Sequence, residues 1–83
     1  MPSDKQRIFD VVKANTLKVM ADLHPDEITI DKSLTDLGAN SVDRVEVVMN
    51  SIEDLNLQVP LAELQGIRSL QGLVDLLHRY VQT

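Results

Sequence analysis

The sequence predicts an all-α fold, a small four-helix bundle with a long loop between helices one and two and a short third helix. Apolar residues recur at helical spacing over most of the chain, and no stretch has the alternating pattern of a half-buried strand. Cap residues and proline or glycine breaks separate the helical stretches. Because 83 residues without an internal repeat or linker can form only one core, we expect a single domain over residues 1–83.

The first helix is predicted to begin after Ser3 and to continue as far as Pro25. Ser3 and Gln6 have the spacing of a capping box, in which each side chain binds the backbone N–H group of the other residue. One side of the helix is apolar at helical spacing, and it is formed by Ile8, Phe9, Val12, Leu17, Val19, Met20 and Leu23.

The segment from Pro25 to Asn40 lacks sustained periodicity and is predicted to be a loop tied to the core. Ser33 and Asp36 have the spacing to cap a single turn that ends at Gly38. The apolar residues expected to anchor this loop are Ile28, Ile30, Leu34 and Leu37.

The second helix is predicted over Ser41 to about Asn56, and Pro60 marks the break before the next element. Asn40 is a good N-cap, and Asp43 completes a reciprocal arrangement that satisfies backbone N–H groups of the first turn. Ser41 then becomes the first helical residue, with its side chain pointing out. A phosphate ester on this hydroxyl would lie at a helix N-terminus, where the positive end of the dipole favours an anion.

The remaining two helices are predicted from breaks and caps near the C-terminus. Leu61 to Gln65 forms a short third helix that Gly66 closes. Ser69 caps the fourth helix, whose apolar residues are Leu70, Leu73, Val74, Leu77 and Val81.

Residues 38–43, Gly-Ala-Asn-Ser-Val-Asp, resemble the phosphopantetheine attachment site of acyl carrier proteins, whose common form is Gly-x-Asp-Ser-Leu. The order of helices and the length of the chain are also similar to that family. The resemblance implies that Ser41 carries 4'-phosphopantetheine as a covalent cofactor and that acyl groups are held on its terminal thiol as thioesters. It also implies a non-catalytic protein, with a phosphopantetheinyl transferase as the partner that attaches the arm.

Two readings of the second helix differ in which apolar residues are buried. Periodicity alone places all of one arc in the core, with Val47 outside it; this arc comprises Val42, Val45, Val48, Met49, Ile52 and Leu55. The resemblance to carriers implies instead that Val42, Val45 and Met49 are exposed, and that Val47, Val48 and Leu55 turn inward. It makes the candidate partner-binding residues Val42, Asp43, Arg44, Val45, Glu46, Met49 and Glu53, with Asp54 as a further acidic residue at the rim.

Residues 40–46, 53–57 and 60–66 are similar to the freestanding carriers of polyketide β-branching cassettes. Membership of that group implies an acetyl donor carrier that an acyltransferase loads with malonyl and a decarboxylating ketosynthase-like enzyme converts to the acetyl form. A hydroxymethylglutaryl synthase homologue then takes the acetyl group. Acceptor carriers of such systems have a tryptophan six residues after the modified serine, where this chain has Val47.

Asn40 and Val42 replace the aspartate and leucine of the common fatty-acid motif. In fatty-acid carriers that aspartate helps the transferase to recognise its substrate, so the change argues against ordinary fatty-acid synthesis. Two alternatives stay open. One is a discrete carrier for another acyl or aminoacyl group, of fatty-acid or nonribosomal type, and the other is a helical interaction module that is never modified.

Composition and motifs argue against other classes of function. A net charge of −5, with Phe9 and Tyr80 as the only aromatic residues, opposes binding to nucleic acid. Ser41 does not fit a Gly-x-Ser-x-Gly hydrolase motif, because Asp43 stands where the second glycine belongs. His24 and His78 are expected to be solvated or to cap helix ends, and neither they nor the carboxylates have the spacing of a zinc or calcium site.

The chain has no apolar run long enough to span a membrane and no export signal at its N-terminus. The absence of cysteine fits a reducing compartment. We therefore expect a cytoplasmic monomer that binds neither membrane nor metal.

Overall fold

The structure, a computed structural model, describes residues 4–67 and 69–81. Within these residues it contains the α-helices α1 (Asp4–Val19), α2 (Ser41–Asp54) and α3 (Leu70–Val81), with the 3-10 turns η1 (Pro25–Glu27) and η2 (Leu61–Leu64). The predicted all-α fold with a long loop before the second helix is confirmed. The predicted short third helix, Leu61 to Gln65, is instead a single 3-10 turn, so the described residues contain three α-helices and not four.

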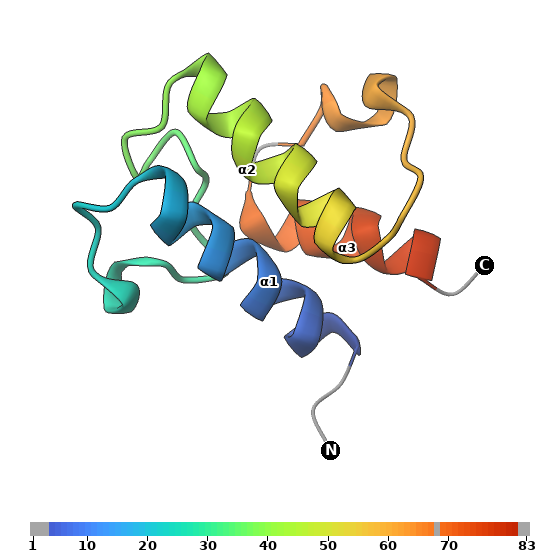
Figure 1. The fold of residues 1–83 in the computed structure, drawn as a ribbon, viewed down its shortest axis with the longest axis horizontal. Helices are drawn as coiled ribbons and strands as arrows, with labels where there is room; N and C mark the ends of the chain where they lie inside the picture. The colour runs from blue at the N-terminus through green and yellow to red at the C-terminus, as the bar shows by residue number, and fades with distance from the viewer. Residues whose placement is uncertain (1–3, 68, 82–83) are drawn as a thin grey trace.

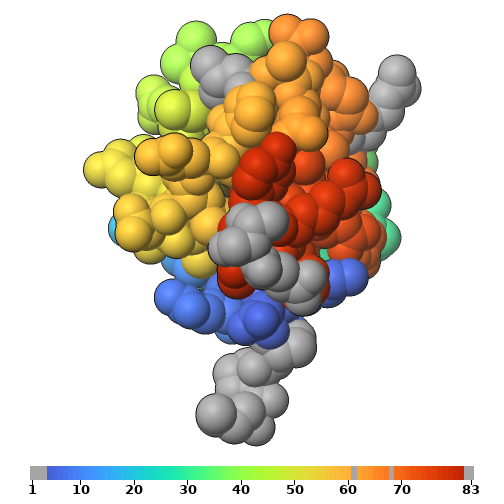
Figure 2. Space-filling model, turned by 90° about the vertical axis from the view of Figure 1, so that its right-hand side faces the viewer, coloured from blue at the N-terminus to red at the C-terminus, as the bar shows by residue number. Residues whose placement is uncertain are grey.

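Helix α1 packs against both α2 and α3, and these two contacts are the most extensive between elements of the described residues. Figure 1 shows α1 and α2 running in roughly opposite directions, with the long loop crossing one end of the helices. The buried core combines residues of all three helices and the loop: Ile8, Val12, Ile28, Leu34, Ala39, Val47, Ile52, Leu70, Leu73, Val74 and Leu77. Figure 2 shows that α3 and the segment before it form much of one face of the molecule.

Helix α1 is shorter than the apolar spacing predicts. It ends at Val19, and the N–H of Met20 makes the last helical bond to the carbonyl of Thr16. Met20 and Leu23 still pack against the core, but they do so from a turn. Apolar spacing identifies the residues that face the core and does not separate a last helical turn from an anchored loop, which explains the error. The predicted cap at Ser3 lies outside the described residues.

The turn at residues 33–38 is capped as predicted. The N–H of Asp36 donates to Ser33 Oγ at 2.9 Å, and the N–H of Ser33 donates to a carboxylate oxygen of Asp36 at 3.1 Å. Gly38 has a φ of +98°, and the N–H of Ala39 reaches back to the carbonyl of Leu34 at 3.0 Å. Gly38 is therefore required for its backbone conformation, which reverses the chain just before α2.

The long loop also provides the backbone acceptors for the start of α3. The N–H of Leu70 donates to the carbonyl of Lys32 at 2.8 Å, and the N–H of Gln71 donates to the carbonyl of Ile30 at 2.9 Å. The first N–H groups of a helix have no partner within the helix, so these two bonds tie the loop to α3.

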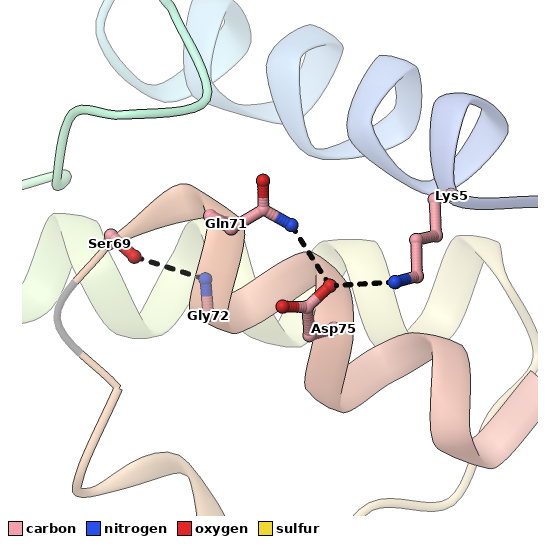
Figure 3. A network of polar contacts seen from close by, with 5 residues as sticks. All are labelled: Lys5, Ser69, Gln71, Gly72 and Asp75. Atoms are coloured by element: carbon pink, nitrogen blue, oxygen red, sulfur yellow. Dashed lines mark hydrogen bonds and ion pairs between the residues drawn. The ribbon is translucent and has the colours of Figure 1, made fainter.

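Ser69 caps α3 as predicted, because its Oγ accepts the N–H of Gly72 at 3.0 Å (Figure 3). One turn further on, Asp75 receives hydrogen bonds from Gln71 and from Lys5 of α1, which joins the two helices. The hydrogen bond from Lys5 is the main reason why the pKa of Asp75 is lowered. Both side chains of this ion pair are substantially exposed, so its contribution to stability is small.

The contact between α1 and α2 contains a buried polar group. Asn15, which is 2% exposed, donates from its side-chain amide to Ser51 Oγ at 3.2 Å and to a carboxylate oxygen of Asp54 at 3.0 Å. Ser51 in turn donates to the carbonyl of Val47 at 2.7 Å. A buried amide without acceptors would be costly, so these bonds fix how α1 sits on α2.

Two glycines should respond in opposite ways to alanine. A Cβ at Gly72 would lie 3.5 Å from Ser69 Oγ and 3.8 Å from a methyl carbon of Ile67, which are ordinary contacts. We expect Gly72→Ala to raise the free energy of unfolding by about 0.5–1 kcal/mol, because glycine is unfavourable inside a helix. Gly38→Ala should lower it by roughly 1–2 kcal/mol, because alanine is strained at positive φ. Urea unfolding of both variants checks this, and shifts of the same sign would contradict it.

Candidate functional site

The site is built around Ser41, the first residue of α2, which is exposed. The predicted capping box is present. The N–H of Asp43 donates to Asn40 Oδ1 at 2.8 Å, and the N–H of Asn40 donates to a carboxylate oxygen of Asp43 at 3.2 Å. Together with the turn at Gly38, this box fixes the direction in which α2 begins and presents the Ser41 hydroxyl outside the helix.

Arg44 brings a positive charge to the Ser41 hydroxyl. Its guanidinium donates to Ser41 Oγ at 3.3 Å and to Thr35 Oγ1 at 3.1 Å. Ser41 and Arg44 are three residues apart and so lie on the same face of α2, one turn from each other. Thr35 belongs to the capped turn before Gly38, so the loop and the helix meet at this guanidinium.

A cleft with a volume of about 810 Å³ has Ser41 in its lining and lies between α2 on one side and α3 with the segment before it on the other. Ser41, Thr35 and Arg44 are the polar residues at one part of its lining. The other polar residues of the lining are Gln65 and Ser69. The rest of the lining is apolar and consists of Leu34, Val45, Val48, Met49, Leu64, Ile67, Leu70 and Leu73. A group attached to Ser41 therefore has an apolar surface beside it, on which a flexible chain can lie.

The structure decides between the two readings of α2. Val42, Val45 and Met49 are 64%, 60% and 43% exposed, whereas Val47 is fully buried. Val48 and Leu55 are partly buried and pack against the core, and Ile52 is buried. The arrangement implied by the carrier resemblance is thus confirmed. The reading from periodicity alone was wrong, because it took the exposed valines as core and left Val47 outside.

The charged candidates divide into two kinds. Glu46 and Glu53 are exposed, and their side chains form no hydrogen bond or ion pair within residues 4–67 and 69–81, so they can contact a partner. Asp43 and Arg44 are half-buried, and each already supports the local geometry around Ser41. A change at either of these two residues would therefore alter the site as well as any partner contact.

Several residues of the cleft were not predicted as part of the site. Thr35 comes from the loop, Leu64 from η2, and Leu73 from α3. Their place beside Ser41 depends on how distant segments pack, and no local sequence motif carries that information.

Residues 4–67 and 69–81 bring together no group of three or more acidic, histidine or cysteine side chains that could hold a metal ion. No helix in the described part of the chain is long and apolar enough to cross a membrane.

Fold and site together define a small helical protein that presents a serine at the start of α2, and comparison with known families shows which class of protein this is. Residues 14–77 match the family described as phosphopantetheine attachment site. The chain belongs to this family and is a phosphopantetheine-bearing acyl carrier protein, not an enzyme. The exposed hydroxyl of Ser41, the adjacent cation of Arg44 and the apolar cleft fit a phosphate-linked, flexible arm.

Two relatives of this chain are acyl carrier proteins. The chain is 39% identical over 80 residues to the polyketide biosynthesis acyl carrier protein AcpK of Bacillus subtilis, covering 96% of this chain and 98% of that protein. It is 35% identical over 77 residues to acyl carrier protein 4 of Arabidopsis thaliana chloroplasts, which covers 93% of this chain and 53% of that protein.

A solved structure gives a similar result. The fold matches a chain from the crystal structure of the curacin biosynthetic pathway HMG synthase in complex with its acetyl donor acyl carrier protein. The TM-score is 0.80 and the sequence identity 33%, and the match covers 88% of this chain and 94% of that chain. Because the match covers most of both chains, the matched chain is about as long as this one.

Proposed function

We propose that this protein carries 4'-phosphopantetheine on Ser41 and serves as the acetyl donor carrier for β-branching in polyketide biosynthesis. The observation that carries the proposal is the likeness, in both sequence and fold, to the donor carrier in the HMG synthase complex. The 39% identity to a polyketide carrier over nearly the whole of both chains supports the same assignment.

The geometry of the site supports attachment at Ser41. Its hydroxyl is exposed at the start of a capped helix, so a transferase can reach it without unfolding the chain. When bound, the arm supplies a terminal thiol that holds the acyl group as a thioester. Asn40 and Asp43 hold the backbone around Ser41, and the cleft beside it offers apolar surface.

The exposed face of α2 has the chemistry of a transient docking surface. Val42, Val45 and Met49 form an apolar patch, and Glu46 and Glu53 add negative charge at its edge. An apolar centre with a charged rim is the usual anatomy of such an interface, and the charges favour partners with basic surfaces. The partners we propose are a phosphopantetheinyl transferase, an acyltransferase, a decarboxylating ketosynthase-like enzyme and a hydroxymethylglutaryl synthase homologue.

The donor assignment is tested by single-turnover acetyl transfer. The acetyl-loaded protein should transfer its acetyl group to the active-site cysteine of a β-branching synthase, with the cysteine sulfur taking the acyl carbon and the arm thiol leaving. A fatty-acid carrier loaded in the same way should transfer poorly, because the synthase has to distinguish carriers of the same fold by their surfaces. Intact-protein mass of the synthase follows the reaction.

A chimera provides the matched control. Replacing residues 40–49 and 53–66 by those of a fatty-acid carrier should remove the preference while leaving the arm in place. Equal rates from both natural carriers would overturn donor specialisation and leave a carrier of general acyl type, as the similarity to the Arabidopsis protein would then suggest. Propionyl-loaded protein, run alongside, measures selectivity for the acyl group.

A further inference from the structure

Arg44 forms no ion pair with a carboxylate of residues 4–67 and 69–81. By contrast, Lys5 of α1 and Asp75 of α3 form an ion pair. Arg44 instead donates to two neutral hydroxyls, those of Thr35 and Ser41. Asp43, its neighbour in sequence, is engaged in the cap of α2.

We propose that Arg44, positioned by Thr35, binds the phosphate of the arm attached to Ser41 and turns the arm towards the cleft between α2 and α3. This inference rests on the attachment at Ser41 proposed above. It assigns to Arg44 a task within the carrier itself, in addition to any contact with partner enzymes.

The position of the guanidinium follows from the chemistry of attachment. Ser41 Oγ, which accepts a hydrogen bond from Arg44 at 3.3 Å, is the atom that becomes the ester oxygen, so the phosphorus would be one bond away from it. A guanidinium group has five N–H donors in a fixed, forked arrangement. The guanidinium of Arg44 makes two hydrogen bonds to described residues, which leaves other donors available. The free donors match the two non-bridging oxygens of a phosphate diester, which share one negative charge.

The start of the helix cannot supply the same interaction through the backbone at Asp43. The N–H of Asp43 is already bonded to Asn40 Oδ1 at 2.8 Å, so the capping box occupies it. The helix dipole still favours an anion at Ser41, and the side chain of Arg44 adds direct hydrogen bonds to the phosphate.

The position of the Arg44 guanidinium also determines the direction in which the arm leaves Ser41. Arg44 lines the cleft together with Val45, Val48 and Met49 of α2. A phosphate held by Arg44 therefore starts the arm on the cleft side of the helix. Because Arg44 is only half-buried, the contact is weak enough to be released when a partner takes up the arm.

A spin-labelled arm tests this inference. A phosphopantetheinyl transferase attaches a pantetheine that bears a nitroxide, and NMR measures the paramagnetic relaxation of the amides of Ile67 and Leu73 in the cleft. In Arg44→Gln we expect that relaxation to fall roughly two- to fivefold, the change in population that corresponds to one partly exposed ion pair. Thr35→Val, which removes the group that positions Arg44, should give a smaller decrease.

Two further variants separate the guanidinium from charge alone. Arg44→Lys keeps the charge but loses the fork, so its relaxation should lie between those of the wild type and Arg44→Gln. Arg7→Gln removes the same charge from an exposed position on α1, outside the cleft, and should behave as wild type. Raising the salt to about 0.5 M should reduce the difference between wild type and Arg44→Gln, because salt screens exposed charges.

The outcomes distinguish the two proposals. Equal relaxation in wild type and Arg44→Gln, or an equal decrease in Arg7→Gln, would overturn the role of Arg44 and leave the attachment at Ser41 intact. Failure of the wild type to accept the arm from any transferase would overturn both. The apo forms of all variants should unfold at the same temperature, which excludes a general loss of structure as the cause.

Discussion

Replacing Ser41 by alanine is expected to abolish attachment of the arm completely. Attachment forms an ester bond to Ser41 Oγ, which alanine lacks, and no neighbouring side chain takes its place in the frame set by the Asn40–Asp43 cap. The fold should not change, because Ser41 is exposed and alanine is favourable in a helix. Intact mass after treatment with transferase and coenzyme A should show one arm on the wild type and none on Ser41→Ala.

Thr29→Val is the matched control for that experiment. It removes another exposed hydroxyl from the loop before α2, and this variant should be modified as completely as the wild type. If Ser41→Ala still gained the mass of an arm, the attachment site would be elsewhere. If the wild type stayed unmodified with several transferases, the proposed carrier function would have to be abandoned.

Aspartate at Val47 is expected to unfold the protein, whereas aspartate at Val45 is not. Val47 is fully buried in the core, and a buried, unpaired charge costs about 3–5 kcal/mol. That penalty is comparable with the lower part of the range expected for the whole stability of 83 residues, about 4–12 kcal/mol. Val45, two residues away in the sequence, is 60% exposed, so Val45→Asp should change stability by less than about 0.5 kcal/mol.

Thermal unfolding followed by circular dichroism measures both effects. Val45→Asp should keep the midpoint of the wild type but slow acyl transfer, because it places a charge in the apolar patch of α2. Val47→Asp should show no cooperative transition at neutral pH. A low midpoint for Val45→Asp would mean that Val45 is part of the core, and a normal midpoint for Val47→Asp would show that Val47 is solvated.

The local chemistry of the site was predictable because its signals lie close together in the sequence. The reciprocal cap of Asn40 and Asp43, the turn capped by Ser33 and Asp36, and the cap at Ser69 each involve groups within three residues, and all three are present. Side chains that satisfy backbone N–H groups over so short a distance depend little on the rest of the fold. The position of Ser41 follows from them.

The burial of α2 needed more than its own sequence. A helical wheel gives every valine the same hydrophobicity, and it contains no information that α1 packs on the side of α2 with Val47 and Ser51. The family resemblance supplied this information, because it carries the result of packing in related chains. The prediction of where α1 ends was wrong for a related reason, since Leu23 packs against the core from outside the helix.

The contact between Arg44 and Thr35 could not be predicted from any local sequence pattern. Arg44 is a candidate for partner binding in the sequence, and Thr35 has no assigned role there. The two side chains meet only because the turn at Gly38 brings the loop back over the start of α2. Interactions across such a reversal depend on backbone conformation rather than on residue type.

The two hydrogen bonds from the loop to α3 have a consequence for motion. The amides of Leu70 and Gln71 stand at the start of a helix, where first-turn amides usually exchange rapidly with solvent, but here the carbonyls of Lys32 and Ile30 protect them. Their hydrogen exchange therefore reports detachment of the loop, not fraying of the helix. Detachment would part the loop that holds Thr35 from the helix that forms one wall of the cleft, so the width of the cleft and the contact between Thr35 and Arg44 beside Ser41 would change together.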